Sequence, residues 1–396
     1  MNFKKSLLRK KRKKESFFKY IMSVSHLWLG LLSSLVVFVV CLSGSLYSFK
    51  TQISDFINYD VVFNKDSDLS EWVNPDVVEQ TFKDKGLQLN SITYPENFSR
   101  NIIATYTNTS EEYSGHFYLH PTTGKVIGKS SNSSAAFFDT MKSLHKNLLL
   151  GNVGNQIVGI SVLIFVVLLI SGLVLWFPSK MSRMKQGLTI KWSAKLPRVI
   201  YDLHNTLGFY TFLLLFFISI TGLYISYPWV KSAVVVSLGG QPVLSSSNSD
   251  AIKSELSGKF ASFFEESLEN QKEKNKTSFV SLDALLNDAN KRLPYEAIIT
   301  ITLPKNDDPN YYVKKINQEN IFNAVLPDKV KYGKDGVFKK LELFSDKTLA
   351  NQFMAISLPL HTGEIMGLTG VIIYFIVVLI GASMPITGFL IWYRKL

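Results

Sequence analysis

Residues 203–228, LHNTLGFYTFLLLFFISITGLYISYP, decide how the chain folds. No formally charged side chain occurs from Leu203 to Val230. A helix that crosses a bilayer needs about 20 apolar residues, so this stretch is predicted to be a membrane span. One histidine, His204, stands near its start, and the pair Thr221-Gly222 stands near its end.

The same arrangement occurs three more times along the chain. The first apolar stretch superposes on the third without a gap, and the second superposes on the fourth. The superposed segments are 26–49 on 204–227 and 145–177 on 361–393, which align His26 with His204, His145 with His361, and Ser43-Gly44 with Thr221-Gly222. We therefore predict four spans that form two copies of one unit, related by an axis along the membrane normal.

Polar segments separate the apolar stretches and set the predicted domain organisation. In order, we expect a basic cytoplasmic tail (1–20), a first span (21–50), a first outside domain (51–144), a second span (145–178), a basic cytoplasmic loop (179–200), a third span (201–229), a second outside domain (230–360) and a fourth span with a short tail (361–396). The predicted fold class is an α-helical membrane protein. A four-helix bundle, built from two parallel repeats, carries two extracytoplasmic α+β domains.

Each outside domain shows a helical pattern followed by strand-like runs. The first is predicted to have a helix at 76–85 and strands at 101–107, 115–120 and 125–128. The second is predicted to have a helix at 282–293, capped by Ser281, and strands at 297–303, 311–316, 323–326 and 337–344. Because the two domains share this order, the outside parts also look duplicated.

The net charge of +12 is unevenly distributed. Residues 1–20 and 179–200, with Arg394 and Lys395, carry +16, and the rest of the chain carries −4. Positive charge in the short segments beside spans places these segments, and both termini, in the cytoplasm. It argues against nucleic-acid binding and suits contact with anionic membrane lipid. The single cysteine, Cys41, lies inside the first span, so no intramolecular disulfide or thiolate metal site is expected.

The four span histidines are the candidate functional residues. A lone histidine at a helix end is usually an interfacial polar residue, but four at repeat-equivalent positions are unusual. A two-fold axis would bring His26 and His204 face to face on the cytoplasmic side, and His145 and His361 on the outer side. We call these the first and second histidine pairs. Two imidazoles facing across a helical bundle are what a bis-histidine b-type haem needs, so two haems are predicted. A zinc site is less well supported, because zinc would need three or four ligands together.

The glycines near the span histidines allow two interpretations. Glycines near the histidines (Gly30, Gly208, Gly44, Gly222, Gly172 and Gly388) provide either clearance for a porphyrin or close packing of helices.

The length of the second span predicts the depth of the second pair. From His145 to Trp176 are 31 residues, about 46 Å of helix, against a hydrocarbon core of roughly 30 Å. The second pair is therefore expected at or just above the outer membrane edge. His116 and His120, four residues apart in a predicted strand, are expected to be surface or substrate-facing residues.

Several motifs together resemble the bacterial PepSY-associated transmembrane family, which includes iron-regulated inner-membrane reductases that carry two haems and act on ferric siderophores. They are HLWLG at 26, LHKNLLLGNVGNQIVG at 144, SGLVLWFP at 171, LHNTLGFY at 203, TGLYISYP at 221 and LHTGEIMGLTG at 360, with YLHPTTGKVIG at 118–128 resembling the PepSY strand-turn-strand. The chain departs from the family at Leu27 and Asn205, where arginine is frequent. Arg198 and Lys19 are then candidates to neutralise the propionates of the haem at the first pair.

The resemblance implies electron transfer outward to Fe(III) in a ferric siderophore, with release of Fe(II) in the periplasm. One electron suffices because siderophores hold Fe(II) far more weakly than Fe(III). No catalytic acid, base or nucleophile is evident, and the cytoplasmic segments are too short to bind a flavin or a nicotinamide, so the electron donor must be a separate molecule. Near the outer span ends, Lys142, Lys146 and Trp229 are candidate substrate contacts.

Two other readings remain open from the sequence. The chain could be a non-enzymatic membrane protein whose PepSY-like domains bind or regulate a periplasmic partner, with purely interfacial histidines. A transporter is less well supported, because the spans lack charged residues near the middle of the membrane.

Overall fold

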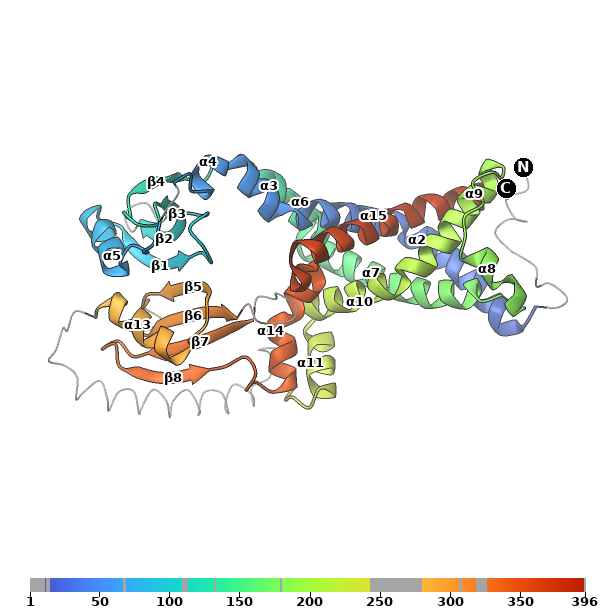
Figure 1. Cartoon of the computed structure of the whole chain (residues 1–396). Coiled ribbons are helices and arrows are strands. Elements are labelled where there is room, and N and C mark those ends of the chain that lie inside the picture. The colour runs from blue at the N-terminus through green and yellow to red at the C-terminus, as the bar shows by residue number, and fades with distance from the viewer. Residues whose placement is uncertain are drawn as a thin grey trace. The chain divides into compact units, whose positions relative to one another are not determined.

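A computed structural model gives the structure of the chain, and it describes residues 11, 15–66, 69–108, 113–131, 133–178, 180–242, 280–305, 308–317 and 326–394. The chain divides into two compact units (Figure 1). The membrane unit comprises residues 1–53, 132–227 and 357–396, and the sheet unit comprises residues 54–131 and 228–356.

Four helices of the membrane unit are long and apolar enough to cross a membrane. They are α2 (Phe17–Ser48), α7 (Gly151–Trp176), the run α9 (Leu196–Asp202), η2 (Leu203–Leu207) and α10 (Gly208–Ser226), and η3 (Glu364–Met366) with α15 (Gly367–Tyr393). Helix α2 packs against α7 and α15, and α10 packs against the same two helices. The chain is therefore a membrane protein built on a bundle in which each of these helices has two neighbours.

The histidines do not open the spans as expected. Helix α2 begins well before His26, and His204 lies in the π-helical turn η2. His145 is in the last turn of a separate helix, α6 (Ala135–Asn147), and His361 is in the last turn of α14 (Leu349–Thr362). The chain breaks after each of these two helices because residues there adopt positive φ, at Leu148 and Gly363 for example. The continuous helix assumed from His145 to Trp176 is therefore wrong.

Shorter helices connect the larger elements. They are α3 (Lys50–Ile57), α4 (Tyr59–Val62), η1 (Met181–Arg183), α8 (Met184–Gly187) and α11 (Pro228–Ser237). In the sheet unit, α5 (Pro75–Asp84) and α13 (Leu282–Arg292) occupy the two predicted helical segments. Ser281 caps α13 as expected, and the Asp76 carboxylate accepts hydrogen bonds from the Ser281 hydroxyl and the Leu282 amide.

The strands of both predicted outside domains form one continuous antiparallel sheet. Its order is β4-β3-β2-β1-β5-β6-β7-β8. The strands are β1 (Gln88–Tyr94), β2 (Ile102–Asn108), β3 (Tyr113–Leu119), β4 (Val126–Lys129), β5 (Ala297–Thr302), β6 (Tyr311–Asn317), β7 (Pro327–Tyr332) and β8 (Phe338–Glu342). Strand β1 pairs with β5, for example Ile92 with Ile301, and both residues are fully buried in one core. Two separate domains were predicted, but the sheet unit has a single core shared by both halves.

Two strand predictions differ from the structure. Strand β1 was missed because a bulge between Leu89 and Ser91 interrupts the alternation of buried residues that marks a strand. The strand predicted at 323–326 falls mostly outside the described residues, and β7 begins only at Pro327. Pro327 can start a strand because its missing N–H is tolerated at that position.

Candidate functional site

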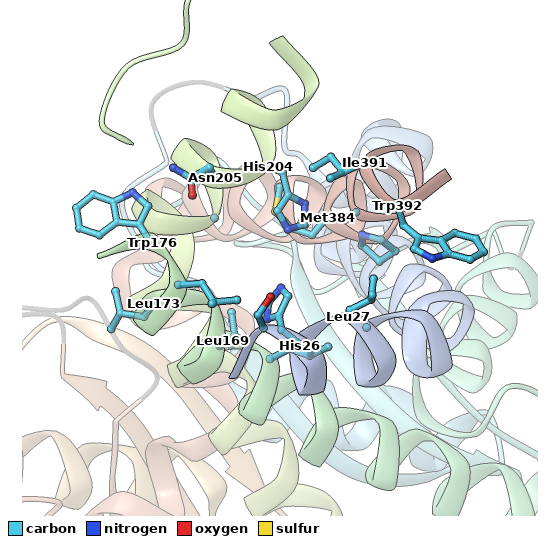
Figure 2. Close-up of a pocket in the computed structure, with 18 of the residues that line it drawn as sticks. His26, Leu27, Leu169, Leu173, Trp176, His204, Asn205, Met384, Ile391 and Trp392 are labelled. Atoms are coloured by element: carbon cyan, nitrogen blue, oxygen red, sulfur yellow. The ribbon is translucent and has the colours of Figure 1, made fainter. Parts of the chain in front are cut away.

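The first histidine pair brings together two helices that are distant in sequence. The imidazole of His26 comes from α2 and that of His204 from η2, and their ring centres lie 6.4 Å apart with the planes at 90°. In Figure 2 the two side chains enter one pocket from opposite sides. The predicted facing of these two histidines is thus present in the structure of the membrane unit.

The second histidine pair has a similar spacing. The ring centres of His145 and His361 lie 6.0 Å apart, with an angle of 51° between the planes. These rings come from the ends of α6 and α14 rather than from the spans themselves. All four predicted histidines therefore meet in pairs, each with its repeat-equivalent partner.

Hydroxyl groups orient the rings of the first pair. His26 Nδ1 lies 2.9 Å from Ser171 Oγ, and His204 Nδ1 lies 2.8 Å from Thr387 Oγ1. Each hydroxyl also donates to a backbone carbonyl of its own helix, at Leu168 and at Ser383. Because the hydroxyl hydrogen is used in that way, the imidazole Nδ1–H must be the donor. The other ring nitrogen, Nε2, is then unprotonated and able to bind a metal.

Backbone carbonyls orient the rings of the second pair. His145 Nδ1 lies 2.8 Å from the Val40 carbonyl oxygen, and His361 Nδ1 lies 3.0 Å from that of Ile218. Val40 and Ile218 are equivalent in the superposition of 26–49 on 204–227. A carbonyl can only accept, so Nδ1 carries the proton in both rings and Nε2 is again left unprotonated. The Thr221 hydroxyl gives His361 an additional contact at 3.1 Å.

The repeated Ser/Thr-Gly pairs of the spans make room for these rings. A Cβ atom added at Gly44 would lie 2.6 Å from His145 Nδ1, and one at Gly222 would lie 2.9 Å from His361 Cε1. At Gly172 and Gly388 the corresponding contacts, to His26 and His204, would be 3.2 and 3.3 Å. Each glycine therefore accommodates an imidazole, a role that sequence analysis had not separated from porphyrin clearance and helix packing.

A cavity of about 740 Å³ surrounds the first pair (Figure 2). Its lining is largely apolar and includes Leu27, Leu169, Leu173, Phe209, Phe212, Met384 and Ile391. Gly30 and Gly208 also line it, and a Cβ added at either would meet nothing closer than 3.6 Å. These two glycines keep space open beside the histidines rather than allowing tight packing of helices.

The spacing of both pairs fits a metal held between two imidazoles. With a metal–nitrogen bond of about 2 Å on each side and roughly 1 Å from nitrogen to ring centre, two axial imidazoles stand about 6 Å apart. Metal-bound histidines also typically donate their second N–H to an oxygen, as all four do here. Among the described residues there is no group of three or more His, Cys, Asp or Glu side chains that suits zinc. The residues present thus fit a bis-histidine haem at each pair.

The contacts of the second pair show where it lies along helix α2. His145 contacts the carbonyl of Val40, which lies well inside α2 rather than at its end. On α2, Val40 follows His26 by 14 residues, so the two pairs are separated by about 21 Å along this helix. The second pair therefore lies beside α2 rather than beyond its end, and its position at or just above the outer membrane edge stays a prediction.

The charged residues proposed near the first pair have different environments. Lys19 lines the cavity, where its Nζ donates to the Phe177 carbonyl at 2.7 Å. Arg198 is not among the lining residues, and its guanidinium pairs with the buried carboxylate of Asp202 at 2.9 Å. Asn205 lines the cavity at the position where the family often has arginine. Of the two predicted cations, Lys19 is the one placed to meet a haem propionate.

The remaining predicted site residues lie on different elements of the two units. Lys142 and Lys146 are exposed on α6, the helix that ends with the second pair. Trp229, 59% exposed on α11, belongs to the sheet unit. His120 Nε2 lies 2.8 Å from the Asp66 carboxylate, and His116 lies 2.9 Å from the Ser130 hydroxyl. Both of these histidines have local partners within the sheet unit, which favours structural roles.

Two comparisons relate the chain to known proteins. A search of curated proteins found no match to the chain. The family described as "PepSY-associated TM region" matches residues 24–395, nearly the whole chain. The match includes all four paired histidines and both predicted outside domains. The chain therefore belongs to the family of PepSY-associated transmembrane proteins.

Proposed function

We propose that the protein is a transmembrane di-haem b reductase that passes electrons outward to Fe(III) in a ferric siderophore and releases Fe(II) in the periplasm. The observation that carries this proposal is the pair of histidine–histidine spacings, 6.4 and 6.0 Å, in which every Nδ1 has an oxygen partner. Four partly buried imidazoles with this common orientation are not explained by interfacial polar roles.

In this proposal His26 and His204 hold one haem, and His145 and His361 hold the other. The Nδ1 hydrogen bonds fix each ring and keep Nε2 available as a ligand. The cavity surrounds the first pair with mainly apolar side chains, and Lys19, which lines it, would neutralise a haem propionate. A bound haem supplies a one-electron carrier at each position. The chain's own residues thus position and insulate two redox centres.

The orientation of the protein is part of the proposal. We infer that it spans the bacterial inner membrane with both termini in the cytoplasm, because the short basic segments carry +16. The two halves of the chain then act as parallel repeats around the histidine pairs. Electrons enter from a separate cytoplasmic or membrane donor at the first pair, and the chelate is met on the periplasmic side. Lys142 and Lys146 are the exposed cations on the helix that carries His145.

The visible spectrum of the purified protein tests the proposal. We expect two low-spin b-type haems per chain, and His26→Ala or His204→Ala should remove about one of the two. His116→Ala, which changes a histidine of the sheet unit, is the matched control and should retain both. A folded but colourless wild-type protein would refute the reductase and favour a non-enzymatic, partner-binding role for the sheet unit.

A further inference from the structure

One face of the sheet carries a group of lysines on β6, β7 and β8. Residues that face each other across antiparallel strands point to the same side of the sheet. Lys314 is opposite Lys329, Lys331 is opposite Lys340, and Tyr312 is opposite Lys331. We call these four lysines with Tyr312 the lysine face.

The lysine face is on the side of the sheet that α13 does not cover. The residues that alternate with it, Val313 and Val330, lie in the core together with residues of α13. Lys315 also points to the α13 side, where its Nζ donates to Asn290 and to the Leu293 carbonyl. By the alternation of a strand, Lys314 and Tyr312 point the opposite way.

Charge balance on the lysine face is incomplete. Like charges directly opposite each other destabilise a sheet, and the lysine face contains two such pairs. Glu342, opposite Lys329, forms an ion pair with Lys340 at 3.2 Å. Within the described parts of the chain, the other three lysines form no ion pair. The fold thus accepts an electrostatic cost at this position.

The surroundings of Lys329 contain charges of both signs. Its Nζ lies 3.9 Å from the centre of the Tyr312 ring. Partial burial lowers the pKa of Lys329, the carboxylates of Glu342 and Asp308 raise it, and the ammonium groups of Lys314 and Lys331 lower it. The Asp308 carboxylate also accepts a hydrogen bond from the Tyr312 hydroxyl at 2.8 Å. A bound anion would offset the repulsion within the two pairs of lysines that face each other across the strands.

The other half of the same sheet face shows that this charge is not a general requirement. The row that contains Lys314 and Lys329 continues to Thr300 and Thr93 on β5 and β1. The hydroxyls of Thr93 and Thr300 lie 3.1 Å apart, within hydrogen-bonding distance. This half of the face is neutral and locally satisfied, so the positive charge is confined to β6, β7 and β8.

We propose that the lysine face binds an anionic, oxygen-rich metal chelate, of the tris-catecholate rather than the neutral trihydroxamate class. The choice of ligand rests on the proposed reductase function. Neighbouring strands are about 4.8 Å apart, so three strands distribute the ammonium groups over roughly 10 Å. That span suits a complex with several bidentate anionic arms better than a single small anion. Compact ammonium charges are well suited to such oxygen donors.

Binding of gallium(III) chelates to the full-length protein tests this inference. Gallium(III) is not reduced under these conditions, so the measured affinity does not depend on whether the protein is a reductase. Calorimetric titrations would compare a gallium(III) tris-catecholate with a gallium(III) trihydroxamate. The variant is Lys314→Gln/Lys331→Gln, which removes one lysine of each repulsive pair and should not impair folding. The matched control, Lys85→Gln/Lys125→Gln, removes two exposed lysines from the other half of the sheet unit.

We expect the wild type and the control to bind the tris-catecholate equally, and the variant to bind it on the order of tenfold more weakly. Added salt should reduce the difference. Equal affinity in variant and control would overturn the assignment, and so would equal wild-type affinity for the neutral trihydroxamate. Competition by inorganic phosphate at concentrations similar to the chelate would show a general anion site instead of a chelate site.

Discussion

The two histidine pairs have nearly the same spacing but are held by different kinds of oxygen. In the first pair, the acceptors are the side-chain hydroxyls of Ser171 and Thr387. In the second pair, they are the backbone carbonyls of Val40 and Ile218. The rings of the first pair also have backbone contacts, at Leu168 and Met384, but the two hydroxyls are partners that a substitution can remove. The orientation of the second depends on helix backbone, and on the glycines that let the rings approach it.

The largest expected difference between the two pairs is how much haem each loses when the neighbouring glycine becomes alanine. Gly44→Ala would place a Cβ 2.6 Å from the ring of His145, which is held against Val40. We expect loss of the haem at the second pair, although alanine favours helix formation over glycine by about 0.5–1 kcal/mol. Gly172→Ala, with a closest contact of 3.2 Å, should have a weaker effect at the first pair.

Haem stoichiometry by pyridine haemochrome assay, normalised to folded protein, checks this prediction. Leu46→Ala is the control, because Leu46 is an exposed residue of the same helix and does not line the cavity. If Gly44→Ala and Leu46→Ala retain the same amount of haem, Gly44 does not limit the approach of the ring.

The cavity beside the first pair can be tested by filling it. Gly208→Phe leaves His204 and its Thr387 contact in place but directs a large ring into the cavity. We expect the first haem to be excluded while the second is kept. Gly208→Ala should retain both haems, since a single Cβ meets only Met384 Sδ at 3.6 Å. Spectra of the reduced proteins distinguish these outcomes, and a Phe variant with two haems would show that this cavity is not the binding space.

A smaller effect is expected from removing one hydroxyl acceptor. Thr387→Val keeps the side-chain shape but removes the hydroxyl that lies 2.8 Å from His204 Nδ1, so that only the backbone contact at Met384 remains. Because that hydrogen bond makes the imidazole a stronger donor, its loss should raise the midpoint potential at the first pair without loss of haem. Thr221→Val should have less effect, because its hydroxyl is the longer contact of His361, at 3.1 Å, and the ring keeps the Ile218 carbonyl at 3.0 Å. Spectroelectrochemical titration measures both potentials, and equal shifts in the two variants would contradict the distinction.

The sequence predicted the membrane spans and the pairing of the histidines well because both are repeated patterns. Apolar length identifies a span without tertiary information, and the superposition assigned each histidine its partner. The oxygen atoms that accept hydrogen bonds from the imidazoles were harder to predict from the sequence. Ser171 and Thr387 stand out as residues before a repeated glycine, but nothing in a sequence marks the carbonyls of Val40 and Ile218 as partners of a distant ring.

Other features depended on contacts that a linear pattern does not contain. The breaks after His145 and His361 arise from positive φ at Leu148 and Gly363, and a leucine gives no warning of this conformation. The pairing of β1 with β5 joins segments about 200 residues apart, and β1 itself has a bulge that hides its alternation. The shared sheet was therefore missed, although the strands of each half were mostly placed correctly.

The most direct test of the account uses His361→Ala, which removes one ligand of the second pair and leaves the first intact. Inverted membrane vesicles would be given a cytoplasmic-side electron donor and a ferric chelate enclosed in the lumen. We predict that the haem at His26 and His204 is still reduced, while reduction of the chelate stops. Chelate reduction at the wild-type rate, in a protein shown to lack the second haem, would contradict the outward relay.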